Sequence, residues 1–386
     1  MKKIAVITST RAEYGLLSPV IKELRKNESS ELKVDLIVTG THLCEDYGYT
    51  VKEIQEDNIR IDHKIVIPVK SDSEYDISSD QAETLLKFTE HFIKERYSAI
   101  VILGDRYEML AIAIAAGNTN TPIFHLCGGD TTEGTKDEWI RHSITKMSYL
   151  HFVTNEISRK RVIQLGEDPE RVFNYGSTSI DNILIITASK KEALDSIYMD
   201  DCNYALCTYH PVTLENESVE ESINEFLEAI KAFPDLQFII TKSNADQGGA
   251  QINALLDNAA QTMYNLNVYS SLGVKRYLAL MKHCEFVLGN SSSGIIEAPA
   301  LHVPTVNIGD RQKGRLQAVS IINCGKKAEE IKQAIINVQD YDHQKLCKGN
   351  ISLYGDGHSG EKIANKIIQI LNSNSINLKK EFYDIK

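Results

Sequence analysis

The N-terminal half of the chain alternates short apolar runs, rich in β-branched residues, with longer stretches in which apolar residues recur at helical spacing. The short runs predict buried strands, and the longer stretches predict amphipathic helices. This alternation predicts a parallel sheet with helices on both faces. The predicted strands cover Ile4–Ile7, Val34–Val38, Ile61–Ile67, Ala99–Leu103, Pro122–His125 and Leu150–Val153. The predicted helices cover about Leu16–Lys26, Ser78–Arg96, Glu108–Gly117 and Asp137–Met147.

The second half repeats this alternation. Helical spacing recurs over residues 219–230 and 252–259, and residues 178–198 are predicted to form a helical crossover between the two halves. A last amphipathic helix, Glu361–Leu371, is predicted to pack back on the first half. The predicted strands cover Tyr204–Tyr209, Gln237–Thr241, Asn267–Tyr269, Phe286–Leu288 and Thr305–Ile308.

These elements predict an α/β protein of two doubly wound domains. The first is expected to span residues 1–177, with the C-terminal helix at about 361–375 packed on it, and the second residues 178–360. Ligands of such sheets bind at the carboxyl ends of the strands, so two domains predict an inter-domain cleft there. Polar residues just after the predicted strands are therefore the candidates for function.

The composition limits the class of protein. A length of 386 residues suits two domains, and 42% hydrophobic with 25% charged residues is typical of a soluble globular protein. The net charge of -11 argues against nucleic-acid and anionic-membrane partners. The 7 cysteines form no CxxC pair, which predicts reduced thiols and a cytoplasmic protein. No apolar run has the length of a signal peptide core or a membrane span.

The segment GNSSSGIIE, Gly289–Glu297, carries the strongest functional signal. It follows a predicted strand and opens a helix, so backbone N–H groups and three hydroxyls gather at a helix N-terminus, which favours an anion. Glu297 lies about one turn inside that helix, where a carboxylate suits sugar hydroxyls better than phosphate. The segment therefore suggests a nucleotide-sugar, and the alternative is an ordinary serine-rich helix cap.

Two strand ends of the first domain carry arginines. The first strand is followed by TSTRAEYG, which lacks the GxGxxG glycines of a dinucleotide site but places Arg11 to meet a phosphate. The strand at Ala99–Leu103 is followed by Gly104, Asp105 and Arg106. An arginine can neutralise a departing phosphate, and a carboxylate can move a proton. The alternative for Asp105 and Arg106 is a structural ion pair at the next helix start.

Acidic residues cluster after the strand Pro122–His125. A glycine-rich, acidic stretch predicts a mobile loop, and its carboxylates could supply acid and base. The spacing has no HExxH-like pattern, so no metal is proposed. Arg141 and His142 are expected to brace the loop from a helix face. The cluster comprises His125, Asp130, Glu133, Asp137, Arg141 and His142.

Three residues of the second domain also follow predicted strands. His210 can donate to phosphate, although a lone histidine is more often structural. Asn244 and Arg311 end two further strands and are expected to approach the same ligand.

A set of motifs occurs in order along nearly the whole chain. The motifs are TSTRAEYG, VTGTHLCEDYG, LGDRYE, GGDTTEG…DEWIRHSITKMS, the His-Pro pair, GNSSSGIIE, NIGDRQKGR and the terminal EFYDI. Taken together, they resemble those of the hydrolysing UDP-N-acetylglucosamine 2-epimerases, and most closely the bacterial sialic-acid-pathway branch. The resemblance implies a GT-B architecture of two Rossmann-like domains, no cofactor, a UDP-sugar substrate and a homodimer or homotetramer. It also implies conversion of UDP-N-acetylglucosamine and water to N-acetylmannosamine and UDP.

The resemblance also assigns roles to residues. Asp105 and Asp137 match carboxylates with catalytic roles. Relatives often have a catalytic glutamate before the glycine pair, where this chain has Cys127, and Asp130 or Glu133 is expected to replace it. Ser291 and Ser292 match diphosphate-binding positions and Glu297 a ribose-binding one. The remaining UDP-binding matches are Arg11, Ala12, Gly15, Arg106, His210, Asn244, Leu272 and Arg311.

Three alternatives stay open. The same chemistry on UDP-2,4-diacetamido-2,4,6-trideoxyglucose (UDP-N,N'-diacetylbacillosamine) would serve legionaminic-acid synthesis. A GT-B glycosyltransferase would pass the sugar to an acceptor rather than to water. A UDP-sugar sensor without turnover is suggested by Cys127 alone.

Overall fold

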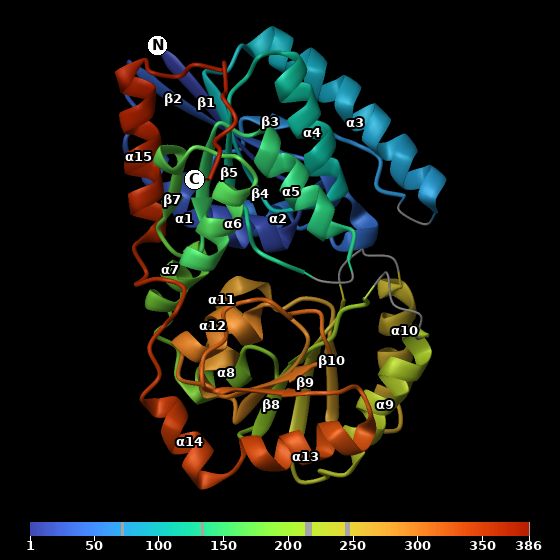
Figure 1. The fold of residues 1–386 in the computed structure, drawn as a ribbon. Coiled ribbons are helices and arrows are strands. Elements are labelled where there is room, and N and C mark those ends of the chain that lie inside the picture. Colours follow the sequence, from blue (N-terminus) through green and yellow to red (C-terminus); the bar gives the residue numbers. More distant parts are fainter. Residues whose placement is uncertain (71–72, 133–134, 213–217, 244–247, 386) are drawn as a thin grey trace. The chain divides into compact units, whose positions relative to one another are not determined.

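The structure, a computed structural model, describes residues 1–70, 73–132, 135–212, 218–243 and 248–385. It divides the chain into two compact units, each built on a parallel sheet (Figure 1). The first unit comprises Met1–Asp130, Asp137–Asp181 and Tyr354–Lys386, and the second Thr131–Lys136 and Asn182–Leu353. The predicted α/β class with two doubly wound domains is confirmed.

The first unit has a seven-stranded sheet in the order β3-β2-β1-β4-β5-β6-β7, and its strand pairs are parallel. Chain order reverses between β1 and β4, which lie side by side, so this is the topological switch point where such sheets bind ligands. The strands are β1 (Lys2–Thr8), β2 (Leu32–Val38), β3 (His63–Lys64), β4 (Ala99–Leu103), β5 (Ile123–Leu126), β6 (Leu150–Val153) and β7 (Val172–Asn174).

Helices cover both faces of this sheet. One face packs against α1 (Arg11–Lys26) and α15 (Ser359–Ser373), whose buried residues include Leu17 and Ile367. The other face packs against α3 (Glu74–Glu95) and α4 (Tyr107–Asn118) through residues such as Phe88. Figure 1 shows α15, in red, beside α1. The shorter helices are α2 (Val51–Glu56), α5 (Asp137–Met147), α6 (Glu156–Gln164) and α7 (Thr178–Leu184).

The second unit has a six-stranded sheet in the order β10-β9-β8-β11-β12-β13, again with parallel pairs. Its switch point lies between β8 and β11. Its strands are β8 (Tyr204–Thr208), β9 (Gln237–Thr241), β10 (Leu266–Tyr269), β11 (Phe286–Gly289), β12 (Thr305–Ile308) and β13 (Ile321–Cys324). Its helices are α8 (Lys190–Asp195), α9 (Val219–Lys231), α10 (Gly249–Ala260), α11 (Gly273–His283), α12 (Ser293–Ala300), α13 (Ala328–Val338) and α14 (Tyr341–Lys348).

Several predicted elements differ from the structure. The helical crossover predicted over residues 178–198 forms two short helices, α7 and α8, and the helix predicted from Ser78 begins at Glu74. The strand expected over Ile61–Ile67 shrinks to His63–Lys64, because β3 is an edge strand that pairs only with Ile37 and Val38 of β2. The first helix begins at Arg11 rather than near Leu16, because Thr10 and Glu13 form a capping box that starts it.

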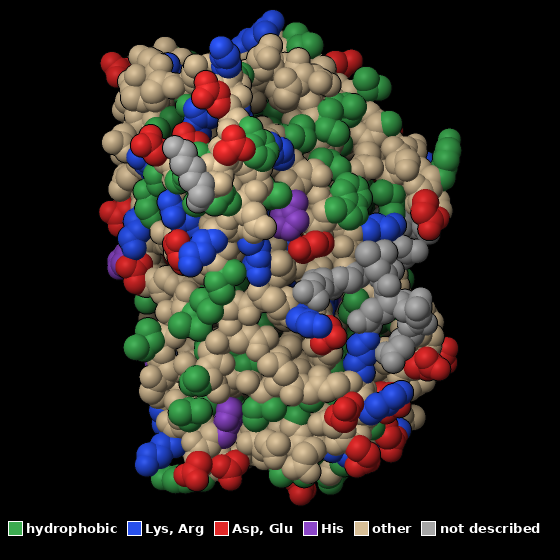
Figure 2. Space-filling view, in the orientation of Figure 1, with side chains coloured by type: hydrophobic (Ala, Val, Ile, Leu, Met, Phe, Trp, Pro, Cys, Tyr) green, Lys and Arg blue, Asp and Glu red, His purple; other side chains and the backbone are tan. Residues whose placement is uncertain are grey.

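The surface has no extended basic area on the face shown in Figure 2, where described acidic and basic side chains are mixed. None of the described helices combines the length and the apolar character that crossing a membrane requires.

Candidate active site

The switch point of the first unit carries Arg11 and Arg106. Arg11 is the first residue of α1, and Arg106 stands at the N-cap position of α4. The Nε of Arg106 donates to Oε1 of Glu108 at 2.8 Å. Ala12 and Gly15 lie in the first turns of α1, where Ala12 is exposed and Gly15 buried. Both arginines thus stand at helix N-termini, where the helix dipole adds to their attraction for an anion.

A buried arginine connects the acidic residues of the same sheet edge. Arg141 of α5 is 2% exposed, and its guanidinium pairs with Asp105 after β4 and with Glu138 at 3.2 Å. Burial alone would lower the pKa of Arg141, but the nearby carboxylates outweigh it and raise that pKa, so the side chain stays charged. Asp137 opens α5 and is half-buried. A carboxylate after β4 and one in the first turn of α5 are therefore held by one fixed cation.

Asp130 has a different environment. Its Oδ1 accepts from Thr154 Oγ1 at 2.8 Å and from Ser158 Oγ at 2.6 Å, and its carbonyl accepts from Arg141 at 2.9 Å. The prediction that Arg141 braces this loop is confirmed. Such buried hydroxyl contacts favour a structural role for the Asp130 carboxylate over proton transfer. Glu133, the other candidate in the loop, lies outside the described residues.

The glycine pair before Asp130 is required by close packing. Gly129 has φ +79°, and a Cβ there would lie 2.3 Å from the carbonyl oxygen of Ser158. Cys127, at the position of the relatives' glutamate, also has a positive φ of 63°. A side chain is strained in this conformation.

His125 is structural. It is fully buried, with Nε2 at 2.9 Å from the Gly104 carbonyl and Nδ1 at 3.3 Å from Thr145 Oγ1. Burial lowers the pKa of His125 to about 3. A ring that stays neutral and is enclosed on both nitrogens ties β5 to the turn before Asp105 rather than exchanging protons with a ligand.

Asn290 organises the switch point of the second unit. Its Oδ1 accepts from the His210 N–H at 2.7 Å, and its Nδ2 donates to the His210 carbonyl at 2.8 Å. Its own carbonyl accepts from Arg311 at 3.1 Å and from Gln312 at 2.8 Å. One buried amide thereby fixes the residues after β8, β11 and β12 relative to one another.

The serine loop, Ser291–Ser293, is held in place by a chain of hydroxyl groups. Ser293 Oγ lies 3.2 Å from Ser291 Oγ and 2.7 Å from the hydroxyl of Tyr277, which lies 3.3 Å from Thr208 Oγ1. Burial raises the pKa of Tyr277 to about 12, so it remains a hydroxyl. Ser292 is the N-cap residue of α12 and makes no side-chain capping bond, but Ser291 Oγ accepts from the Ser293 N–H at 3.4 Å, so capping explains one of the three serines. The half-buried Glu297 lies one turn into α12, as predicted.

Two further candidates are limited by the structure. Leu272 is 2% exposed and its side chain belongs to the core, so only its backbone can meet a nucleotide. Asn244 lies outside the described residues.

We expect Asn290→Ala to weaken UDP binding. The substitution removes both hydrogen bonds to the His210 backbone, each buried group costing about 1–3 kcal/mol when left unpaired. The resulting freedom of His210 and Arg311 should lower UDP affinity by roughly tenfold or more. Isothermal titration calorimetry with UDP measures this loss.

A matched control is Asn265→Ala. Asn265 is also buried, and its Nδ2 donates to the Phe233 carbonyl at 3.1 Å, just before β10. Its loss should lower stability without changing UDP affinity. Equal affinity losses in the two variants would contradict the role of Asn290.

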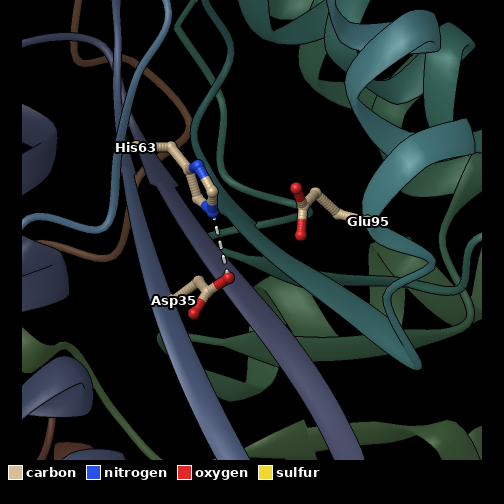
Figure 3. A group of neighbouring side chains, drawn as sticks. All are labelled: Asp35, His63 and Glu95. Atoms are coloured by element: carbon tan, nitrogen blue, oxygen red, sulfur yellow. Dashed lines mark hydrogen bonds and ion pairs between the residues drawn. The ribbon is translucent and has the colours of Figure 1, made fainter.

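One group of described side chains resembles a metal site. Asp35, His63 and Glu95 point toward one another from β2, β3 and α3 (Figure 3). However, the Nζ of Lys3 lies 2.9 Å from Asp35 Oδ2 and 2.5 Å from Glu95 Oε2. The lysine already supplies the cation, so the group is an ion-pair network that joins β1, β2 and α3.

Several residues of these sites were not predicted from the sequence. Asn290 acts by contacts to residues that are distant in the chain, whereas Glu138 contacts Arg141 and His142 of its own helix. Glu13 and Glu108 were also missed. Only Glu13 had a local signal in the sequence, since T-x-x-E at Thr10–Glu13 is a capping-box pattern.

Comparison with known proteins agrees with this fold. The sequence model of the family described as UDP-N-acetylglucosamine 2-epimerase matches residues 22–368. The co-structure of S. aureus MnaA with UDP superposes with a TM-score of 0.81, at 20% identity and with 100% of both chains covered. That similarity supports the GT-B-like α/β fold.

Two curated relatives match along the whole chain. The hydrolysing GDP/UDP-N,N'-diacetylbacillosamine 2-epimerase of Campylobacter jejuni is 37% identical over 100% of this chain and 99% of its own. The polysialic acid biosynthesis protein P7 of Escherichia coli is 38% identical over 100% of this chain and 98% of its own. The chain therefore belongs to the UDP-N-acetylglucosamine 2-epimerase family and is an enzyme of the hydrolysing UDP-sugar 2-epimerase type.

Proposed function

We propose that the protein converts UDP-N-acetylglucosamine and water to N-acetylmannosamine and UDP, as a step toward sialic-acid-type sugars. In the elimination step a base removes the C2 proton while the C1–O bond to UDP breaks, which leaves 2-acetamidoglucal. Water then adds its hydroxyl at C1, and a proton returns to C2 from the opposite face. The C2 inversion needs two proton-handling groups or a reoriented intermediate.

The observation that carries this proposal is the set of carboxylates around Arg141. Asp105 and Glu138 pair with its guanidinium, and Asp137 is the next residue to Glu138. We assign proton transfer to Asp105 and Asp137. A buried, permanently charged arginine fixes Asp105 without competing for its proton at neutral pH. Because Asp130 is enclosed by hydroxyls, it is a weaker candidate for this chemistry.

UDP binding is assigned to the arginines and the serine loop. Arg11, Arg106 and Arg311 would neutralise the leaving diphosphate, an electrostatic contribution commonly worth several kcal/mol. The N–H groups that open α12 suit phosphate oxygens, and Glu297 suits the ribose hydroxyls. These assignments agree with the fold likeness to a protein solved with UDP.

The second candidate substrate is UDP-N,N'-diacetylbacillosamine. The activity in the name of the Campylobacter jejuni relative favours it, whereas the polysialic acid role in the name of the Escherichia coli relative favours UDP-N-acetylglucosamine. The two sugars differ only at C4 and C6, so the chemistry assigned to Asp105 and Asp137 serves both.

The test is proton NMR of the reaction with each UDP-sugar in D2O. We expect release of UDP, a free sugar with inverted C2, and solvent deuterium at C2, because the returning proton comes from a group that exchanges with solvent. The preferred sugar shows the larger kcat/KM. A product that keeps its C2 configuration, or turnover that requires an acceptor sugar, contradicts the proposal and favours a glycosyltransferase.

A further inference from the structure

Two buried glutamates, Glu13 and Glu108, each follow an arginine of the first switch point by two residues in the chain. Glu13 is 5% exposed and Glu108 is 2% exposed. Ser9 Oγ lies between them, 2.9 Å from Glu13 Oε2 and 2.8 Å from Glu108 Oε1. The second oxygen of each glutamate, Glu13 Oε1 and Glu108 Oε2, is buried and has no hydrogen-bond partner among the described residues. Two carboxyl groups are thus joined through one hydroxyl in a region closed to solvent.

The fold holds this arrangement in place. Ser9 directly follows β1, and Glu108 is the second residue of α4, which follows the neighbouring strand β4. Glu13 Oε2 also accepts from the backbone N–H of Ser9 at 2.7 Å. Gly40, with φ +59°, lets the loop after β2 pack on Ser9, since a Cβ there would lie 2.8 Å from Ser9 Cβ. The three side chains therefore have little room to separate.

The number of hydrogen atoms sets the charge of this group. Ser9 has one hydroxyl hydrogen and can donate to only one of the two carboxyl groups at a time. Glu108 also accepts from the guanidinium of Arg106, and this charge-assisted contact makes it the natural acceptor of the Ser9 hydrogen. The contact between Ser9 and Glu13 is then a hydrogen bond only if Glu13 carries a proton.

The surroundings of Glu13 favour the neutral acid. Burial and the charge of Glu108 raise the pKa of Glu13 to about 8, although the hydrogen bonds from the backbone and side chain of Ser9 and the charge of Arg106 act the other way. Among the described residues, the charged groups that face Glu13 are Glu108 and Arg106. Burial of a second carboxylate beside the first would be costly unless it were neutralised.

We propose that Glu13, Ser9 and Glu108 form a proton-sharing group in which neutral Glu13 leaves Glu108 to position the Arg106 guanidinium for the UDP diphosphate. Glu108 and Glu13 are positioning residues that act through Arg106. The inference rests on the proposed function for the role of Arg106. Under this proposal, the proton that Glu13 carries at neutral pH controls how strongly Arg106 attracts phosphate.

The proposal predicts different changes in UDP affinity when each of the two glutamates is replaced by glutamine. Glu13→Gln replaces a neutral acid by a neutral amide of the same shape, so UDP affinity at about pH 7 should stay close to that of the wild type. Glu108→Gln removes the carboxylate that orients Arg106, so UDP affinity should fall roughly tenfold and KM should rise more than kcat falls. Calorimetry with UDP and steady-state kinetics measure both. Equal losses in the two variants, or unchanged affinity in Glu108→Gln, would overturn the proposal.

The pH dependence provides a second test that needs no folded Glu108 variant. UDP affinity of the wild type should fall between about pH 7 and about pH 9, as Glu13 ionises next to Arg106, and in Glu13→Gln it should stay flat. UDP itself is fully ionised in this range, since the second pKa of a phosphate monoester is about 6. Flat affinity in the wild type, or an equal fall in both proteins, would overturn the proposal.

A matched control is Glu167→Gln in the same unit. Glu167 is equally buried, with His151 at 2.9 Å and Lys146 at 2.8 Å, and should change stability but not UDP affinity. The two levels of inference can fail separately. Binding of UDP with the expected pH dependence but without epimerase turnover leaves the proton-sharing group standing and removes the proposed function. Turnover with a UDP affinity that does not change with pH leaves the proposed function standing and removes the proton-sharing group.

Discussion

Replacing Asp105 with asparagine is expected to lower kcat by about 10²–10⁴-fold, the usual contribution of a positioned acid or base. The amide keeps the shape of the side chain but cannot take up the C2 proton or return one. Because Asp105 is not assigned to the nucleotide, UDP affinity should change far less than turnover. Asp137→Asn is expected to behave in the same way. Steady-state kinetics with calorimetry of UDP binding separates the two effects.

The control for Asp105→Asn must also break an arginine–aspartate pair. Asp62→Asn does so in the same unit, where Asp62 lies 2.6 Å from Arg25 in the last turn of α1. This variant should lose some stability and keep its turnover. Near wild-type kcat in both Asp105→Asn and Asp137→Asn would remove these residues from the proton-transfer step.

The stability of the wild type should fall, relative to that of Glu13→Gln, as the pH rises from about 4.5 to about 8. The pKa of Glu13 rises from 4.5 to about 8 on folding, mainly because of burial. The folded chain therefore keeps the proton longer than the unfolded chain does. The stabilisation by the neutral acid is complete below the unfolded pKa and is lost through the folded pKa. The full difference is roughly 5 kcal/mol in the free energy of unfolding.

Urea unfolding of both proteins at several pH values between about 5 and 9 measures this difference. Glu167→Gln provides a control of opposite sign. Burial raises the pKa of Glu167, but its hydrogen bonds to His151, Lys146 and Lys380 outweigh burial and lower that pKa to about 2. The contribution of Glu167 to the free energy of unfolding is therefore constant above about pH 5. A constant gap between wild type and Glu13→Gln over the same range would show that Glu13 is ionised throughout.

The strands were the most predictable part of the fold. Buried parallel strands such as Ala99–Leu103 and Gln237–Thr241 are continuous apolar runs, and the structure has them at the predicted residues. The strands β7 and β13 were missed because they are short, and their half-buried residues do not form such a run. Edge strands depend on one neighbour for pairing, and that neighbour is a tertiary contact.

The candidate site divides in the same way. Residues immediately after strands, such as Arg106 and His210, could be named because the sheet edge follows from the strand order. Glu108 and Asn290 could not, because their importance comes from partners far away in the chain: Ser9 is 99 residues from Glu108, and His210 is 80 residues from Asn290. Neither contact leaves a local pattern in the sequence.

The packing of α15 against α1 also bears on how the protein is synthesised. Ile363, Ile367 and Leu371 complete the core that contains Ile4 and Leu17, yet they leave the ribosome after the whole of the second unit. Part of the apolar surface of the N-terminal sheet therefore stays uncovered while later residues are translated. Domains generally fold as units during synthesis, so the second unit can become compact before the first is finished. The order of maturation is then the reverse of the order of translation.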